Sequence, residues 1–74
     1  MRSFSEFLYD ANTTYYEHPF NWRYGQTIMN VLYLYWPEKY MQILKTDDDC
    51  FFNDEIVETL LTKLEKEWPD DDGY

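Results

Sequence analysis

Apolar residues recur every three or four positions along most of the chain, which is the spacing of one helix face. The first such segment runs from about residue 4 to 15, and its apolar positions are Phe4, Phe7, Leu8, Ala11 and Tyr15. Ser3 and Glu6 fit a capping box, in which each side chain bonds the other residue's backbone N–H. His18-Pro19 stops any continuation, because proline disfavours helical geometry in the preceding residue. We therefore predict a first helix over residues 4–15.

A second segment, from about residue 22 to 35, is apolar over a wider arc. Its positions are Tyr24, Gly25, Ile28, Met29, Val31, Leu32, Tyr35 and Trp36, which cover about 160° of a helical wheel. An arc this wide predicts a central helix that is buried on more than one side. Gly25 lies within it, where the missing side chain predicts the close approach of a neighbouring helix and outweighs a propensity cost of about 1 kcal/mol.

The opposite face of this segment is polar, with one interruption. Arg23, Gln26 and Asn30 form a line at helical spacing. They either satisfy nearby loop carbonyls or form a polar contact surface with Tyr33. Tyr33 and Leu34 are not explained by the packing of this helix. They either contact the chain ends or form an exposed apolar spot.

Two further helices are predicted in the second half. Trp36-Pro37 marks the start of a short one over residues 37–45, which buries Tyr40, Met41 and Leu44. Asp47 to Asp49 then form a solvated loop, and Phe51-Phe52 returns to the core. Asn53 or Asp54 caps the last helix, and Pro69 ends it. Its apolar stripe consists of Val57, Leu60, Leu61, Leu64 and Trp68.

The resulting fold class is all-α, because no strand-like alternation, internal repeat or long linker interrupts the pattern. We predict one small bundle of three to four helices with an aromatic-rich core over residues 1–68, and an acidic disordered tail over residues 69–74. Aromatic residues make up 22% of the 74 residues. Each can bury roughly 150–250 Å², so they replace the disulfides that a chain with a single cysteine lacks.

Charge is distributed unevenly along the chain. Residues 1–46 hold four acids and four bases, whereas residues 47–74 hold eleven acids against two lysines and so carry the entire net charge of −9. Such a field repels nucleic acid and anionic membranes and attracts basic partners. Solubility is the alternative explanation, since small proteins are often charged merely to stay dispersed.

Conventional catalytic and metal sites are not indicated. Cys50 and His18 are the only cysteine and histidine, and nothing in their spacing predicts the contact that nucleophilic catalysis needs. A calcium loop beginning at Asp47 fails where Phe51 and Phe52 occupy its fifth and sixth positions. One cysteine and one histidine cannot supply the four ligands of zinc. We expect no enzyme activity, metal or cofactor.

The same composition argues against direct nucleic-acid binding and indicates where the protein is located. Six basic residues against fifteen acids do not form a positive groove, and the two glycines form no phosphate loop. No stretch approaches the roughly 20 apolar residues that span a bilayer, and no signal-peptide pattern is visible. A lone thiol suits a reducing compartment, so we expect a cytoplasmic location.

The acidic residues of the last predicted helix share one side. Asp54, Glu58 and Glu65 fall within about 40° of one another on a helical wheel. Successive members of this set are separated by roughly 6 and 10 Å along the helix axis. The phosphates of one duplex strand repeat about every 3.4 Å along the duplex axis. With Asp47–Asp49 and Asp70–Asp72 they form a row of carboxylates that fits a groove built for phosphates.

The chain also resembles a known family. Trp22-Arg23-Tyr24-Gly25-Gln26 is followed by Asn30, Leu32, Pro37, Ile43, Thr46, Asp49 and Phe51. This string, over about residues 21–68, resembles short, uncharacterised bacteriophage and bacterial proteins with a W-R-x-G-Q-x-x-x-N-x-L-x-x-x-x-P core. Their D-P-F-Y turn reads Asp49-Cys50-Phe51-Phe52 here, without the proline. The resemblance implies a phage setting, in which small acidic proteins often inhibit host machinery, and it carries over no functional residues.

These observations predict a non-enzymatic, acidic protein-binding module, phage-encoded and active in a bacterial host cell. Its partner is a basic host protein that binds nucleic acid, such as a CRISPR effector, a restriction enzyme or another nuclease, which it inhibits by carboxylate mimicry of phosphates. The candidate partner-binding residues are Asp47, Asp48, Asp49, Asp54, Glu58 and Glu65. The alternative is a small self-associating protein, a homodimer without inhibitory role, that uses Tyr33 and Leu34.

Overall fold

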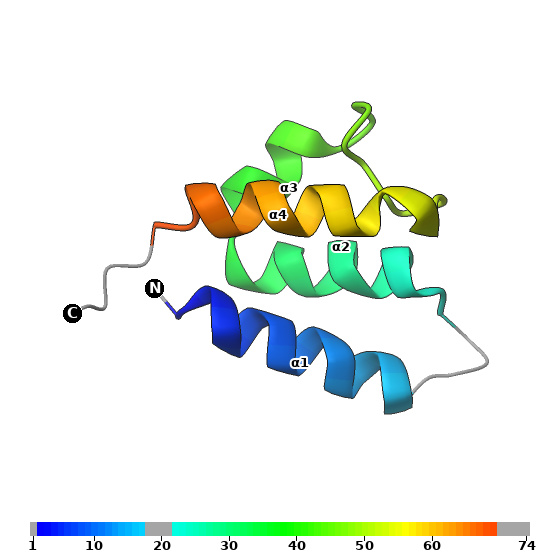
Figure 1. Cartoon of the computed structure of the whole chain (residues 1–74), viewed down its shortest axis with the longest axis vertical. Coiled ribbons are helices and arrows are strands. Elements are labelled where there is room, and N and C mark those ends of the chain that lie inside the picture. Colours follow the sequence, from blue (N-terminus) through cyan, green and yellow to red (C-terminus); the bar gives the residue numbers. More distant parts are fainter. Residues whose placement is uncertain (1, 18–21, 70–74) are drawn as a thin grey trace.

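The computed structural model describes residues 2–17 and 22–69 (Figure 1). These residues form four α-helices and one short 3-10 helix, and no strand occurs among them. In chain order the elements are α1 (Phe4–Glu17), α2 (Tyr24–Tyr35), α3 (Pro37–Ile43), η1 (Asp54–Ile56) and α4 (Val57–Glu67). The all-α prediction is confirmed. The stop expected at His18-Pro19 lies outside the described residues, and so does the tail expected at residues 69–74 except for its first residue, Pro69.

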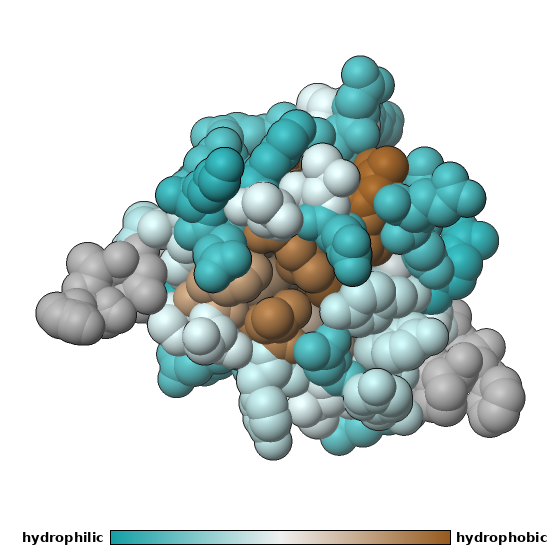
Figure 2. All heavy atoms as spheres, viewed as in Figure 1, coloured by the Kyte–Doolittle hydropathy of each residue, from teal (hydrophilic) through white to brown (hydrophobic). Residues whose placement is uncertain are grey.

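Helix α2 is the central element, as its wide apolar arc predicts. It packs against α1, α3 and α4, and in Figure 1 it lies between α1 and α4. Its buried residues are Gly25, Thr27, Ile28, Met29, Val31 and Leu32. Figure 2 shows apolar atoms near the centre of one face, over α2 between α1 and α4, with hydrophilic residues around them. The core therefore reaches the surface along this seam.

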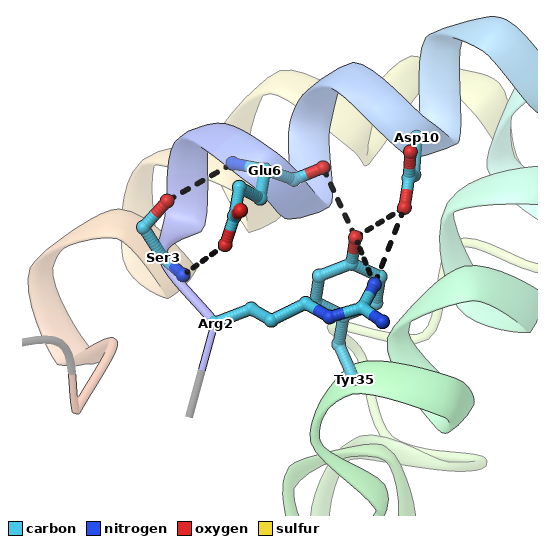
Figure 3. Close-up of polar contacts among 5 residues, drawn as sticks. All are labelled: Arg2, Ser3, Glu6, Asp10 and Tyr35. Carbon is cyan, nitrogen blue, oxygen red and sulfur yellow. Dashed lines mark hydrogen bonds and ion pairs between the residues drawn. The ribbon is translucent and has the colours of Figure 1, made fainter.

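Helix α1 begins with the predicted capping box. The Ser3 Oγ accepts a hydrogen bond from the Glu6 N–H at 3.1 Å, and the Ser3 N–H donates to Glu6 Oε1 at 3.2 Å (Figure 3). Two N–H groups that a helix start leaves without intrahelical partners are thereby satisfied. Phe7 and Ala11 are the buried residues of this helix, which continues to Glu17 rather than ending at residue 15.

An aromatic cluster closes the end of the bundle where α4 stops. The Trp68 ring lies 5.5 Å from Phe4, 5.1 Å from Phe7 and 5.3 Å from Trp36, measured between ring centroids. Its Nε1 donates a hydrogen bond to the backbone carbonyl of Arg2 at 2.8 Å. Helix α4 ends at Glu67, just before Trp68-Pro69, and buries Val57, Leu60 and Leu64. The predicted stripe of α4 and its end are confirmed.

Helix α3 is shorter than predicted and buries a different residue. It ends at Ile43, and Lys45 follows in the left-handed region with φ of 65°. Ile43 is buried, whereas the Met41 side chain, which was expected in the core, is 62% exposed. In a helix of two turns only one narrow face can contact the core, and Met41 lies off that face.

The turn before α4 also differs from the prediction. Phe51 packs against the core, but Phe52 is 79% exposed. The Asn53 N–H donates to the Cys50 carbonyl at 3.1 Å, so the chain reverses here and sends neighbouring side chains in different directions. The Asn53 side chain accepts from the Glu55 N–H at 3.0 Å and so caps η1, after which α4 begins at Val57.

Candidate functional site

The six candidate carboxylates lie on three elements. Asp47, Asp48 and Asp49 lie in the turn after α3, Asp54 begins η1, and Glu58 and Glu65 lie on α4. Their local contacts separate them into two groups. Some hold the fold together, and others are exposed without an ion pair.

Asp48 and Asp49 hold the turn between α3 and η1. The Asp48 carboxylate pairs with the Lys63 ammonium at 2.8 Å, which ties the turn to α4. Asp49 accepts from two backbone groups, the Lys45 N–H at 2.8 Å and the Phe51 N–H at 2.9 Å. These bonds satisfy the backbone around the left-handed Lys45. Among the described residues no group of three or more His, Cys, Asp or Glu side chains is placed to hold a metal ion.

Asp54 caps the central helix, although it lies 29 positions after the residue that it bonds. Its Oδ1 accepts a hydrogen bond from the Gly25 N–H at 2.8 Å. Arg23, at the N-cap position of α2, makes no side-chain cap bond, so Asp54 takes over that role. A carboxylate is also favoured there because the start of a helix carries partial positive charge. Asp54 therefore lies on η1 and contacts α2, and it does not extend a row along α4.

Gly25 makes this contact possible. A Cβ at this position would lie 2.0 Å from the Cys50 carbonyl oxygen and 2.9 Å from the Asp54 carboxylate. The close approach predicted from the sequence is present, but the approaching segment is the connection between α3 and α4 rather than a helix.

Glu58 and Glu65 are the exposed pair. They stand seven residues apart on α4, so they share one face and are separated by about 10 Å along the axis. No ion pair involves either carboxylate within residues 2–17 and 22–69, whereas Lys63 pairs with Asp48 and Lys39 with Glu67. Asp47 is exposed as well.

Sequence reasoning missed one member of this surface. Glu55 is exposed and stands three residues before Glu58. Its spacing of three residues from Glu58 is the signal that would have identified it. We call Asp47, Glu55, Glu58 and Glu65 the open carboxylates.

Cys50 is buried, as its apolar surroundings predict. Its Sγ donates a weak hydrogen bond to the Gly25 carbonyl at 3.4 Å. Burial raises the pKa of the Cys50 thiol to about 12, and the negative charge of Asp49 adds to the effect. The thiolate that nucleophilic catalysis needs is therefore disfavoured at neutral pH. His18, the other half of the pair considered from sequence, lies outside the described residues.

Tyr33 and Leu34 do not form one spot. The Tyr33 ring packs edge-on against Tyr40 of α3, with 5.1 Å between centroids, and remains 53% exposed. Leu34 is 75% exposed and lines a hollow on the side of α1 instead. Consecutive helical residues point about 100° apart, which separates them.

The hollow beside Leu34 has a volume of about 560 Å³. Its lining residues are Arg2, Asp10, Thr14, Val31, Leu34 and Tyr35. Figure 3 shows three of them converging: the Tyr35 hydroxyl donates to Asp10, and the Arg2 guanidinium donates to the Tyr35 hydroxyl at 3.0 Å and pairs with Asp10 at 3.6 Å. Partial burial, and secondarily the Asp10 carboxylate, raises the pKa of Tyr35.

The polar line of α2 is divided between two environments. The Arg23 guanidinium lies 5.8 Å from the centroid of the exposed Phe52 ring. Gln26 and Asn30 are half-buried. Arg23 therefore covers part of an aromatic ring that the turn leaves in solvent.

No protein-family model, curated protein or solved structure matches this chain. In the part of the chain that the structure describes, none of the helices combines the length and apolar character needed to cross a membrane.

Proposed function

We propose that this protein is a non-enzymatic, acidic protein-binding module that occupies the nucleic-acid groove of a basic host protein. The observation that carries the proposal is the exposure of Glu58 and Glu65 on one face of α4 with no ion pair on either carboxylate in the described residues. This face belongs to the segment, residues 47–74, that carries the entire net charge of −9.

The spacing of this pair supports mimicry of a phosphate backbone. The two carboxylates lie about 10 Å apart along the helix axis, which is close to three phosphate repeats of about 3.4 Å along one strand. A basic groove would draw in such a surface by long-range attraction, as it draws in the phosphates of a nucleic acid. Glu55 and Asp47 extend the open carboxylates beyond this pair.

The class of target comes from the resemblance to short phage proteins. A phage setting makes a host defence nuclease, such as a CRISPR effector or a restriction enzyme, the natural basic partner. The protein would inhibit it by competing with DNA or RNA for the same groove.

The test is a matched pair of charge reversals in the full chain. Glu58→Lys with Glu65→Lys changes the net charge by +4 on α4, while Glu17→Lys with Glu38→Lys makes the same change at exposed sites on α1 and α3. Asp54 is spared because it accepts the Gly25 N–H. The partner is captured from bacterial lysate with wild-type protein and identified by mass spectrometry, and its Kd for each variant is then measured by titration.

We expect the α4 pair to weaken binding by well over tenfold and the control pair to weaken it far less. The difference should shrink at high salt, because screening removes long-range attraction. DNA or RNA should compete with the wild-type protein for the partner. Equal binding by wild type and the folded α4 variant would show that the acidic face serves solubility only. A complex that nucleic acid does not displace would show that the protein binds its partner outside the nucleic-acid groove.

A further inference from the structure

The segment that joins α3 to α4 packs less deeply than the helices that it connects. Among residues 44–56 Cys50 alone is buried, whereas Ile43 and Val57, on either side of the segment, belong to the core. Two further side chains pack against the core but stay partly exposed: Phe51 and Ile56. We call residues 44–56 the strap; in Figure 1 it is the loop that leads from the end of α3 to the start of α4. The strap therefore has little buried apolar surface of its own to hold it in place.

Hydrogen bonds within the strap hold it in shape. The Asp49 carboxylate accepts the Lys45 N–H at 2.8 Å and the Phe51 N–H at 2.9 Å. The Asn53 N–H donates to the Cys50 carbonyl at 3.1 Å. None of these bonds involves a residue of α1, α2 or α4, so the strap can keep them when it moves. It is therefore able to move as one piece.

The strap is attached to the bundle at the start of α2. Asp54 Oδ1 accepts the Gly25 N–H at 2.8 Å, and the Cys50 Sγ donates to the Gly25 carbonyl at 3.4 Å. The backbones are in direct contact there, because a Cβ on Gly25 would lie 2.0 Å from the Cys50 carbonyl oxygen. A further attachment, the pair of Asp48 with Lys63 of α4, is partly exposed, and such pairs contribute little to stability. The contacts with Gly25 come from one segment, so we expect them to form and break together.

Separate contacts hold the other end of α4. Trp68, directly after this helix, packs against three aromatic rings and donates to the Arg2 carbonyl. Lys39 of α3 pairs with Glu67 at the same end. A helix of 11 residues is about 16 Å long, so these contacts lie far from the strap, and Figure 1 shows the two at opposite ends of α4. Helix α4 can therefore stay packed on the bundle when the strap moves away.

We propose that the strap opens as a unit while the four α-helices stay packed, and that this local opening is the route by which Cys50 reaches solvent. The opening breaks the contacts with Gly25, the pair between Asp48 and Lys63, and the burial of one small side chain. Water can then satisfy the Gly25 N–H, as it does at helix starts without a cap. Segments with few buried apolar contacts open at a lower free energy than the whole fold.

The opening changes the acidic surface of the protein. Two of the open carboxylates, Asp47 and Glu55, lie on the strap, whereas Glu58 and Glu65 lie on α4. The acidic surface thus has a movable part and a fixed part. A partner that contacts both parts of the closed form would keep the strap closed, because it binds that form better. This consequence rests on the proposed function, whereas the opening itself is a property of the chain alone.

Labelling of Cys50 in the native full chain at pH 8 tests the proposal without any partner. The Cys50 thiolate attacks the disulfide of dithiobis(nitrobenzoate), which leaves a mixed disulfide on the protein and releases a coloured aromatic thiolate. The labelling rate, divided by the rate for the same chain unfolded in urea, gives the fraction in which the thiol is accessible. Equilibrium urea denaturation gives the globally unfolded fraction for comparison.

We expect the accessible fraction to exceed the globally unfolded fraction by more than about tenfold in the absence of urea. At low urea the accessible fraction should rise with a slope below about half of the equilibrium m value, because opening the strap exposes little surface. Labelling that follows global unfolding at every urea concentration would overturn the proposal.

Variants at the two ends of α4 locate the opening. Asp54→Ala should raise the accessible fraction about 5- to 30-fold, which corresponds to the loss of one capping bond. Asp54→Asn keeps an accepting oxygen and should raise it less. Trp68→Phe should lower global stability and leave the accessible fraction unchanged. An unchanged accessible fraction in Asp54→Ala, or an increase in Trp68→Phe that equals its increase in the globally unfolded fraction, would show that the strap does not open separately.

Discussion

The Trp68 indole donates its N–H to the backbone carbonyl of Arg2 at 2.8 Å, across 66 positions of the sequence. This bond joins the residue after α4 to the residue before the cap of α1. The same indole packs against the rings of Phe4, Phe7 and Trp36. Trp68 therefore joins the start of α1 to the end of α4, although it lies outside any helix.

Truncation should show where the folded unit ends. A chain that ends at Trp68 should keep the helical circular dichroism and cooperative melting of the full chain. A chain that ends at Leu64 loses the indole, which costs about 3–5 kcal/mol for a buried aromatic out of a total near 5–15 kcal/mol. Trp68→Phe, which keeps an apolar ring but removes the N–H, should cost less. Equal thermal stability of the two truncated chains would contradict the role assigned to Trp68.

Gly25→Ala should destabilise the protein, although alanine is the better helix former. On propensity alone the change would add about 0.5–1 kcal/mol of stability. The new Cβ would instead lie 2.0 Å from the Cys50 carbonyl, a backbone atom, so the connection between α3 and α4 would have to move. Overpacking of this kind costs about 1–3 kcal/mol, and the hydrogen bond from Gly25 to Asp54 would weaken as well.

Urea denaturation measures this effect, with Thr59→Ala on the exposed face of α4 as the control. The control should be neutral or slightly stabilising, since threonine is the poorer helix former. A Gly25→Ala protein as stable as wild type would mean that the connection yields easily and that the close contact is not needed for the fold.

Cys50 should make stability fall in alkaline solution. Burial raises the pKa of its thiol from the ordinary value of 9.0 to about 12. Below pH 9 the thiol is protonated in both states and its contribution is constant. Above pH 9 the unfolded chain loses this proton while the folded chain keeps it, so the free energy of unfolding decreases from about pH 9 toward pH 12.

Comparison with Cys50→Ala isolates this contribution, because the pKa values of Tyr24 and Tyr35 are also raised and act in the same direction at higher pH. Denaturant melts from pH 7 to 11 should show a steeper decrease for wild type than for the variant. In native protein the thiol should also resist alkylation at pH 8. Parallel pH profiles for the two proteins would mean that the thiol ionises equally well in the folded state.

The candidate site was predictable only in part. Charge clustering located Glu58 and Glu65 correctly on an exposed helix face, because a spacing of seven residues returns to the same side. It could not show that Asp48 is neutralised by Lys63 or that Asp49 holds a turn, since both depend on how the segment after α3 folds back. The separate positions of Tyr33 and Leu34 depended on which helices flank α2.

The helices, their order and the central place of α2 could all be predicted from the amino-acid sequence. These features depend on local spacing: the Ser3–Glu6 cap, the apolar stripes, and the prolines at residues 37 and 69. The exposure of Met41 and Phe52, and the capping by Asp54 of a helix 29 positions earlier in the chain, depend on how the segments pack together. Periodicity in the sequence gives the direction in which a side chain points around the axis of its own helix, because successive residues are rotated by a fixed angle. Only packing brings the carboxylate of one segment to the free N–H of another.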